Sequence, residues 1–165
     1  MERIELRAYR PEDLQAIAAL DNVCFEAPFR FSRAAMKRFV EARNALNRLA
    51  WAVDEDSENA ILAGFCVVHV ERGRREGLLG YVVTLDIAPP YRRCGLAHRL
   101  MRSLEAMAAR AGAGEMFLHV AAENHGAIRL YERLGYHPVR REKGFYGEGG
   151  DAMAYRRALE IAGEV

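Results

Sequence analysis

Hydrophobic residues near the start of the chain recur first at every second position and then at helical spacing. Ile4, Leu6 and Ala8 alternate with charged residues, which predicts a strand with one buried face. A helix is then expected from Pro11, because proline suits the first helical turn and acidic residues follow it. The apolar stripe of this helix is predicted to consist of Leu14, Ile17, Ala18 and Val23.

A loop and a second helix are expected next. Residues 25–31 are interrupted by Pro28 and are predicted to form the loop. Ser32 is a suitable N-cap for a helix that we expect to run to about Leu46. We predict that this helix carries a basic face made of Arg33, Lys37, Arg38, Arg43 and Arg48. The face could contact an acidic ribosomal or nucleic-acid surface, or it could simply be solvated.

The middle of the chain is dominated by strand patterns. Apolar runs at 49–53 and 61–70 flank the polar segment 54–59, so the two runs are predicted to form a hairpin. A polar turn at 72–77 leads into a long predicted strand over 78–88. A helix should follow, because Leu96, Leu100, Leu104 and Met107 fall at helical spacing before Gly112 and Gly114.

The last third of the chain completes a layered fold. A short strand is predicted at 116–121, then a helix capped by Asn124 and stopped by Gly135, then strands at 136–140 and 152–158. The predicted order is β-α-α-β-β-β-α-β-α-β-β, which indicates an α/β (α+β) domain with a mixed sheet and helices on its faces. The strand–helix–strand unit at 78–121 predicts a right-handed crossover between parallel strands. A length of 165 residues suits a single domain, 1–165.

Composition narrows the classes of partner. Lys plus Arg is 24 and Asp plus Glu is 23, so a net charge of +1 gives no general attraction to nucleic acid or membranes. No apolar run approaches the ~20 residues that span a bilayer, and the N-terminus lacks the apolar core of a signal peptide. We therefore expect a cytoplasmic protein. The cysteines Cys24, Cys66 and Cys94 suggest neither a disulfide framework nor a metal site.

The most informative segment is a basic turn between a strand and a helix. Pro89 and Pro90 stop the strand, and Arg92, Arg93 and Gly95 precede the helix. Unpaired N–H groups at a helix N-terminus form an anion site, and a diphosphate suits it best. The alternative is an ordinary strand–turn–helix with surface arginines. The glycine spacing matches neither a dinucleotide fingerprint nor a P-loop.

This turn resembles a known cofactor motif. Arg92-x-x-Gly95-x-Ala97 is similar to the acyl-CoA pyrophosphate motif of the GNAT acetyltransferases, which have a mixed sheet of about seven strands. The resemblance implies acetyl-CoA as the cofactor, with no metal. It implies that backbone amides hold the pyrophosphate, and these belong to Arg92, Arg93, Cys94, Gly95, Leu96 and Ala97. It also implies that strand residues Leu85, Asp86 and Ile87 pair with the pantetheine arm.

A second motif downstream resembles the same family. Asn124 is followed by Ala127-x-x-Leu130-Tyr131 and by Leu134-Gly135-Tyr136. In the family the Asn contacts the CoA arm and the Tyr lies near the sulfur. The resemblance therefore implies that Asn124 binds the cofactor and that Tyr131 protonates the departing thiolate. Considered alone, Asn124 would suit a helix N-cap and Tyr131 a core aromatic residue.

Two further segments are similar to the protein N-terminal acetyltransferases of this superfamily. Phe25, Pro28 and Phe29 lie in a segment that resembles the first helix–loop, which shapes the pocket for the first residue of a peptide. Phe145 and Tyr146 resemble the late hairpin whose aromatic residues clamp the peptide backbone. A glycine-rich hairpin tip with surface aromatic residues is the alternative for the second segment.

Tyr81 and His119 are candidates for the catalytic base. Their strands resemble those of the eukaryotic enzymes that act on an initiator Met followed by another residue, where Tyr and His act together through ordered water. A peptide α-amine has a pKa near 8, and a neutral His with a pKa of about 6.5 can accept its proton. A lone strand histidine is also often structural. The bacterial ribosomal-protein enzymes carry Glu at the position of His119, so their alanine-starting substrate cannot be carried over.

The expected function is acetyl transfer to the N-terminal α-amine of a protein or peptide, with ribosomal proteins among the candidates. The amine should attack directly, through a tetrahedral intermediate and without an acetyl-enzyme; Cys94 as a nucleophile is the alternative. A small amine (polyamine, amino acid or aminoglycoside) or a lysine side chain is the alternative substrate. A CoA-binding domain without catalysis is a third possibility, against which Tyr131 and His119 argue. We expect a monomer or homodimer without specific nucleic-acid or membrane partners.

Overall fold

The computed structural model describes residues 1–73 and 76–160, and their strands form one seven-stranded sheet in the order β1-β2-β3-β4-β5-β7-β6. The strands are β1 (Glu2–Arg7), β2 (Ala45–Asp54), β3 (Ala60–Arg72), β4 (Leu78–Ile87), β5 (Ala113–Ala121), β6 (His137–Glu142) and β7 (Ala152–Ala158). The helices are α1 (Leu14–Cys24), α2 (Arg33–Val40), α3 (Leu96–Arg110) and α4 (His125–Arg133), with short 3₁₀ turns at Pro11–Asp13 and Pro89–Tyr91. The predicted element order is confirmed, and β4 and β5 form the predicted parallel pair.

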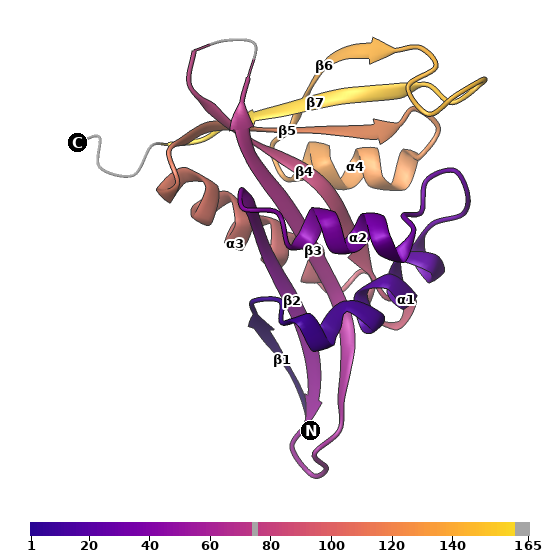
Figure 1. The fold of residues 1–165 in the computed structure, drawn as a ribbon, viewed down its shortest axis with the longest axis vertical. Coiled ribbons are helices and arrows are strands. Elements are labelled where there is room, and N and C mark those ends of the chain that lie inside the picture. Colours follow the sequence, from indigo (N-terminus) through magenta and orange to yellow (C-terminus); the bar gives the residue numbers. More distant parts are fainter. Residues whose placement is uncertain (74–75, 161–165) are drawn as a thin grey trace.

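Helices cover both faces of the sheet, as predicted (Figure 1). Helices α1 and α2 pack on one face around a core that includes Ile17, Met36 and Phe65. Helix α3, together with residues of α4, packs on the other face around Leu100 and Leu104. Burial of the apolar side chains in these two cores is the main favourable term in folding.

The sheet splits between its two central strands. Hydrogen-bonded pairing between β4 and β5 covers only 78–81 and 113–117, and beyond these residues the strands diverge (Figure 1). Val83 lies at a bulge, because Val67 pairs with Thr84 while Val68 pairs with Val82. A bulge bends its strand and increases the local twist. The remainder of β4 and the end of β5 therefore face each other as open edges.

The second helix is shorter than predicted. It ends at Val40, and β2 begins at Ala45, because Leu46 pairs with Val68 in the sheet. The predicted Ser32 cap is confirmed, since its hydroxyl accepts a hydrogen bond from the Ala35 N–H at 3.1 Å. The predicted five-residue basic face is wrong. Arg43 lies in the turn after the helix and Arg48 lies in β2, so neither shares a helical face with the earlier basic residues.

The first helix also differs in detail from the prediction. Pro11 opens a 3₁₀ turn, and the α-helix starts at Leu14. Val23 was expected to be in the apolar stripe, but its side chain is 64% exposed. The stripe of Leu14, Ile17 and Ala18 instead continues at Asp21, seven residues after Leu14 and fully buried. An acidic residue thus occupies a core position of α1.

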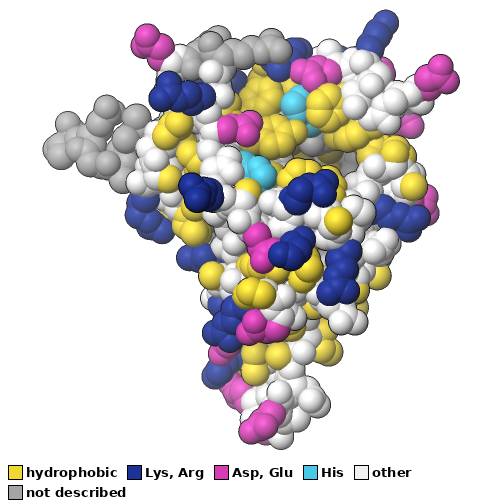
Figure 2. Space-filling model, viewed as in Figure 1, with side chains coloured by type: hydrophobic (Ala, Val, Ile, Leu, Met, Phe, Trp, Pro, Cys, Tyr) yellow, Lys and Arg dark blue, Asp and Glu magenta, His cyan; other side chains and the backbone are white. Residues whose placement is uncertain are grey.

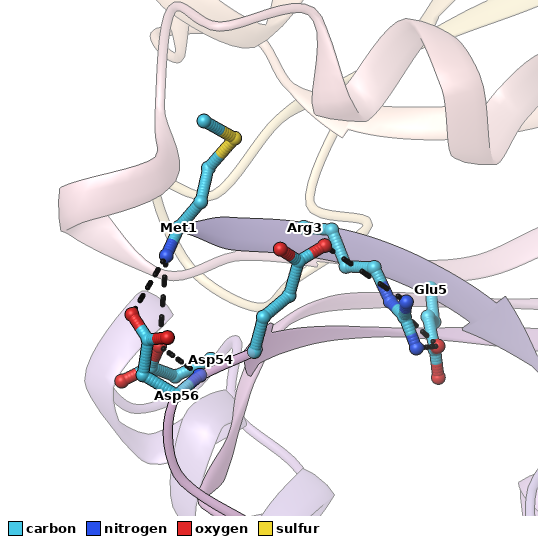
Figure 3. A network of polar contacts seen from close by, with 6 residues as sticks. Met1, Arg3, Glu5, Asp54 and Asp56 are labelled. Carbon is cyan, nitrogen blue, oxygen red and sulfur yellow. Dashed lines mark hydrogen bonds and ion pairs between the residues drawn. The ribbon is translucent and has the colours of Figure 1, made fainter.

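Polar contacts hold the first strand to the β2–β3 hairpin. The amino group of Met1 lies 3.4 Å from Asp56 Oδ2 and 3.8 Å from Asp54 Oδ1 (Figure 3). Arg3 Nη1 lies 4.0 Å from Glu55 Oε1 of the hairpin, while Arg3 Nη2 lies 2.6 Å from Glu5 Oε1 within β1. These groups are exposed, and exposed ion pairs contribute little to stability.

In the part of the chain that the structure describes, no helix combines the length and apolar character needed to cross a membrane.

Candidate active site

Tyr81 and His119 meet where the sheet splits. Tyr81 is the last residue of β4 that pairs with β5, opposite Phe117, and His119 lies two residues further along β5. The Tyr81 hydroxyl is 2.8 Å from His119 Nδ1. Tyr81 also pairs with His69 of β3, whose Nε2 lies 2.7 Å from the carbonyl oxygen of Phe39 in α2. The hydrogen-bonded pair therefore lies on the sheet face that carries α1 and α2.

Aromatic side chains enclose the histidine. The Phe145 ring stacks on His119 with 4.1 Å between ring centroids and 17° between planes, and Phe117 lies edge-on at 5.4 Å. Hydrophobic side chains gather around histidine on this face of the molecule (Figure 2). Burial lowers the pKa of His119, although nearby Glu142 opposes this shift. Burial also raises the pKa of Tyr81 to about 12. At neutral pH His119 is therefore neutral and Tyr81 keeps its proton.

Glu142, at the end of β6, was not predicted as a site residue. Its Oε2 atom lies 3.0 Å from His119 Nε2. Arg140 Nε donates to Glu142 Oε1 at 2.7 Å, and this contact holds the pKa of Glu142 below its usual value. An ionised carboxylate thus faces the second nitrogen of the histidine. The sequence signal is weak, because β6 pairs with β7 and reaches His119 only through the tertiary fold.

Two loops meet beside this histidine. Phe29, in the α1–α2 loop, contacts Tyr146, in the β6–β7 loop, with 4.8 Å between ring centroids. Tyr146 in turn packs edge-on against Phe145 at 4.9 Å. The structure therefore brings three of the predicted substrate residues together with His119. Pro28 is exposed next to Phe29. Phe25 follows the end of α1 and is half-buried, and no ring contact joins it to this cluster among the described residues.

The predicted phosphate turn leads from β4 into α3. Gly95 is the N-cap of α3 with φ at +81°, and Arg93 also has a positive φ of +61°. Within the described ranges, the N–H groups of residues 93–97 donate no hydrogen bond, so five adjacent donors remain available at a helix N-terminus. Leu96 is buried and anchors the helix, whereas Ala97 is half-buried. This turn has the donors that an anion requires.

Arg92 and Cys94 make contacts of their own within this turn. The Arg92 N–H donates to the Pro89 carbonyl at 3.3 Å, so the available donors begin at residue 93 and not at Arg92. The Arg92 guanidinium turns back to the end of β4 and donates to the Ile87 carbonyl at 3.0 Å. Cys94 Sγ donates to the Tyr91 carbonyl at 2.7 Å. The guanidinium of Arg92 therefore stabilises the end of β4 by its hydrogen bond to the Ile87 carbonyl.

Asn124 and Tyr131 occupy the start and middle of α4. Asn124 Oδ1 accepts from the Ala127 N–H at 3.2 Å, which confirms the predicted N-cap. Tyr131 is buried in the core beneath α4, and burial raises its pKa, with the neighbouring Cys66 and Asp86 adding to the shift. Its hydroxyl donates to no other group of the described residues and stays protonated at neutral pH. Tyr131 thus combines a retained proton with a buried position close to Asp86 of β4.

The three predicted strand residues of β4 point to different faces. Leu85 pairs with Cys66 and packs, like Ile87, against the core beneath α3. Asp86 pairs with Phe65, so its side chain turns to the α1 face and is fully buried there. Asp86 therefore contributes its backbone, and not its side chain, to the open edge of β4. In residues 1–73 and 76–160, no group of three or more His, Cys, Asp or Glu side chains is arranged to hold a metal ion.

Comparison with known proteins identifies the family. The profile of the Acetyltransferase (GNAT) family matches residues 14–136, which include the phosphate turn, the Tyr81–His119 pair and α4. The chain belongs to this family. This result confirms the resemblance drawn from the two sequence motifs, and with it the assignment of the chain as an acetyltransferase.

Relatives and solved structures refine this placement. The N-alpha-acetyltransferase daf-31 of Caenorhabditis elegans is 27% identical over 158 residues, covering 94% of this chain and 83% of that protein. The structure of Arabidopsis thaliana NAA60 with a bisubstrate analogue matches with a TM-score of 0.82 and 26% identity, covering 97% of this chain and 100% of that one. NAA60 with acetyl-CoA matches with a TM-score of 0.80 and 26% identity, covering 95% and 99%. These matches confirm the GNAT fold.

Proposed function

We propose that this acetyltransferase moves the acetyl group of acetyl-CoA to the N-terminal α-amine of a protein or peptide. The observation that carries the proposal is the 2.8 Å contact between Tyr81 and His119, beside the aromatic cluster of Phe29, Phe145 and Tyr146. Similarity to an N-alpha-acetyltransferase, and to a NAA60 structure that holds a bisubstrate analogue, supports the same substrate class.

The residues present fit acetyl-CoA, which would supply the acetyl group as a thioester. The available N–H groups of 93–97 suit a pyrophosphate, and Arg93 adds positive charge beside them. The open edge of β4 after Tyr81 offers backbone groups to an extended, amide-containing arm. Asn124, at the start of α4, caps the helix with its oxygen, and its amide nitrogen donates to no other residue in the described part of the chain.

Proton transfer from the amine would run through Tyr81 and His119. Tyr81 would pass its proton to His119 Nδ1 as it takes one from the α-amine, directly or through water. The Glu142 carboxylate near Nε2 would stabilise the imidazolium that forms. The amine nitrogen would bond to the acetyl carbon while the carbon–sulfur bond breaks. Tyr131, which holds its proton at neutral pH, is the proposed donor to the departing sulfur.

A peptide acetylation assay tests this function. Purified protein would be incubated with acetyl-CoA and short peptides that vary at the first two positions, while thiol release is followed and the acetyl site is mapped. We expect release that depends on a free α-amine. Matched peptides with a formylated N-terminus and an internal lysine should give none. Acetylation of only the lysine, or of only small amines in a parallel panel, would contradict the proposal. Binding of acetyl-CoA without any turnover would indicate a domain that has lost catalysis.

A further inference from the structure

Two acidic side chains are fully buried where α1 packs on β4. Asp21, in the last turns of α1, and Asp86, on β4, each have 0% exposure. Ionised carboxylates are almost never fully buried unless a cation pairs with them. Neither residue has an ion-pair partner among the residues that the structure describes. The nearest cation is Arg92, and its guanidinium is bonded to the Ile87 carbonyl and directed at Cys24 Sγ.

Each carboxyl group has one oxygen that accepts a hydrogen bond from a donor and one that does not. Asp21 Oδ2 accepts from the Phe31 N–H at 2.7 Å, and Asp86 Oδ1 accepts from the Thr84 hydroxyl. Asp21 Oδ1 and Asp86 Oδ2 are buried without a donor in the described part of the chain, yet the two side chains are within hydrogen-bonding reach of each other. Because carboxylate oxygens only accept, this contact requires a proton between them.

The surroundings favour one retained proton. Burial and the Asp21 carboxyl group raise the pKa of Asp86 well above its usual value, whereas Thr84 and Arg92 act in the opposite direction. The other titratable groups nearby are Cys24 on α1, Cys66 on β3 and Tyr131 beneath α4, and the pKa of each is raised, so all three are neutral at pH 7. Two carboxyl groups in contact cannot both ionise without a large cost. At neutral pH the pair therefore carries a single negative charge.

This pair connects the two sides of the proposed site. The Phe31 N–H ends the loop of residues 25–31, whose Phe29 touches Tyr146. Asp86 belongs to the open edge of β4, beside the predicted acetyl-CoA arm. We propose that Asp21 and Asp86 share a proton, and that the resulting hydrogen bond holds the 25–31 loop against β4 and so positions Phe29 for substrate binding. The pair consists of positioning residues, and its role in peptide binding rests on the proposed function.

The shared proton is measurable without turnover. In protein labelled with ¹³C at aspartate carboxyl groups, we expect one carboxyl signal at pH 7 that keeps its proton and shifts in D₂O. The same signal should move in Asp21→Ala, because Asp86 loses its carboxyl partner. Ordinary acidic titration of every aspartate would overturn the proposal. This experiment on the unaltered protein remains decisive even if a variant fails to fold.

Two substitutions of Asp21 test the positioning role. In Asp21→Asn, the amide can accept from Phe31 and donate to Asp86 without a shared proton, so the peptide KM should stay within about twofold of wild type. Asp21→Ala removes both contacts and should raise the peptide KM about tenfold, with acetyl-CoA affinity nearly unchanged. Equal loss in the two variants, or equal weakening of peptide and acetyl-CoA, would contradict the proposal.

Hydrogen exchange of the Phe31 amide separates this inference from the proposed function. The amide should lose protection in Asp21→Ala and keep it in Asp21→Asn, whatever the substrate is. Failure of every peptide with wild-type protein would overturn the proposed function, whereas the exchange and carboxyl measurements would still decide the shared proton. Unchanged protection in Asp21→Ala would show that the contact does not hold the loop.

Discussion

The chemistry of the site depends on how the environments of a few residues differ. His119 is half-buried between aromatic rings, so its pKa lies below the usual 6.5, whereas burial keeps Tyr81 protonated. A neutral imidazole that accepts a hydrogen bond from a phenol forms a proton relay suited to an amine with a pKa near 8. Glu142 adds a fixed negative charge near the other ring nitrogen.

Removal of either member of the relay should slow transfer without weakening cofactor binding. We expect His119→Ala and Tyr81→Phe each to lower kcat by about 100-fold, because positioned acid–base groups typically contribute that much or more. Acetyl-CoA affinity, measured by calorimetry, should change little. His137→Ala is the matched control, since His137 is exposed on β6. Wild-type kcat in both relay variants would exclude them from the base role.

The charge of Glu142 should be visible in the titration of His119. The carboxylate favours the imidazolium, so Glu142→Gln should lower the pKa of His119 further below 6.5, the value of unperturbed histidine. Ring-carbon NMR titration measures this shift directly. Glu148→Gln, at an exposed position in the β6–β7 loop that follows Glu142, should leave the titration unchanged. An unchanged or raised pKa in Glu142→Gln would show that Glu142 does not act on the ring.

At the scale of elements, the turn before α3 concentrates the anion-binding groups. Five consecutive N–H groups are available because the chain turns sharply at Arg93 and Gly95, both with positive φ. Only glycine adopts this conformation without strain. The sequence predicted this turn correctly because prolines, glycine and the helix start act over a few residues.

A glutamate at Gly95 should abolish acetyl-CoA binding. The substitution places a negative charge where a pyrophosphate would bind, and the positive φ adds a strain of about 1 kcal/mol. Gly77→Glu is the matched control, because Gly77 has φ at +102° with nothing within 4 Å of an added Cβ, as at Gly95. Gly77→Glu should lose similar stability but keep affinity. Wild-type affinity in Gly95→Glu would refute the assignment of the turn.

Prediction of the elements failed where pairing between strands overrides helix propensity. Residues 41–46 continue a helical pattern, yet Leu46 joins β2 because its partner Val68 offers a place in the sheet. Asp21 follows the buried stripe of α1, while apolar Val23 is exposed. In both cases a contact with a distant segment decided the outcome, and a local pattern contains no information about that contact.

At the scale of the whole molecule, the split between β4 and β5 creates the site. Strands β1–β4 with α1 and α2 provide Tyr81 and Phe29, whereas β5–β7 provide His119, Glu142, Phe145 and Tyr146 (Figure 1). Residues from both halves of the sheet therefore build one active site. The contact between Phe29 and Tyr146 joins the two halves above the split.

The buried pair Asp21–Asp86 should make stability depend on pH. The folded chain keeps a proton on the pair, because the pKa of Asp86 is raised, whereas the unfolded chain loses that proton above about pH 4. The free energy of unfolding should therefore fall as pH rises from there to the folded pKa, by up to ~1.4 kcal/mol per pH unit for one proton. Asp86→Asn removes this dependence.

Urea unfolding of wild type and Asp86→Asn between about pH 4.5 and 8.5 measures this difference in slope. The titration of His119, whose pKa is lowered, is common to both proteins and cancels in the comparison. Wild-type protein should lose more stability than Asp86→Asn across the range. If the free energy of unfolding varies with pH in the same way in both proteins, the pair carries no proton that the unfolded chain lacks.

The sequence by itself determined the order of elements, the caps at Ser32 and Asn124, and the turn at 92–97, because each depends on neighbouring residues. Motif resemblance also placed Tyr81 and His119 on the central strands. The tertiary structure alone decided that Glu142 faces His119 and that Asp21 meets Asp86. These contacts join β6 to β5 and α1 to β4, which are far apart along the chain. They depend on sheet order and helix packing, and the periodicity of a single segment specifies neither.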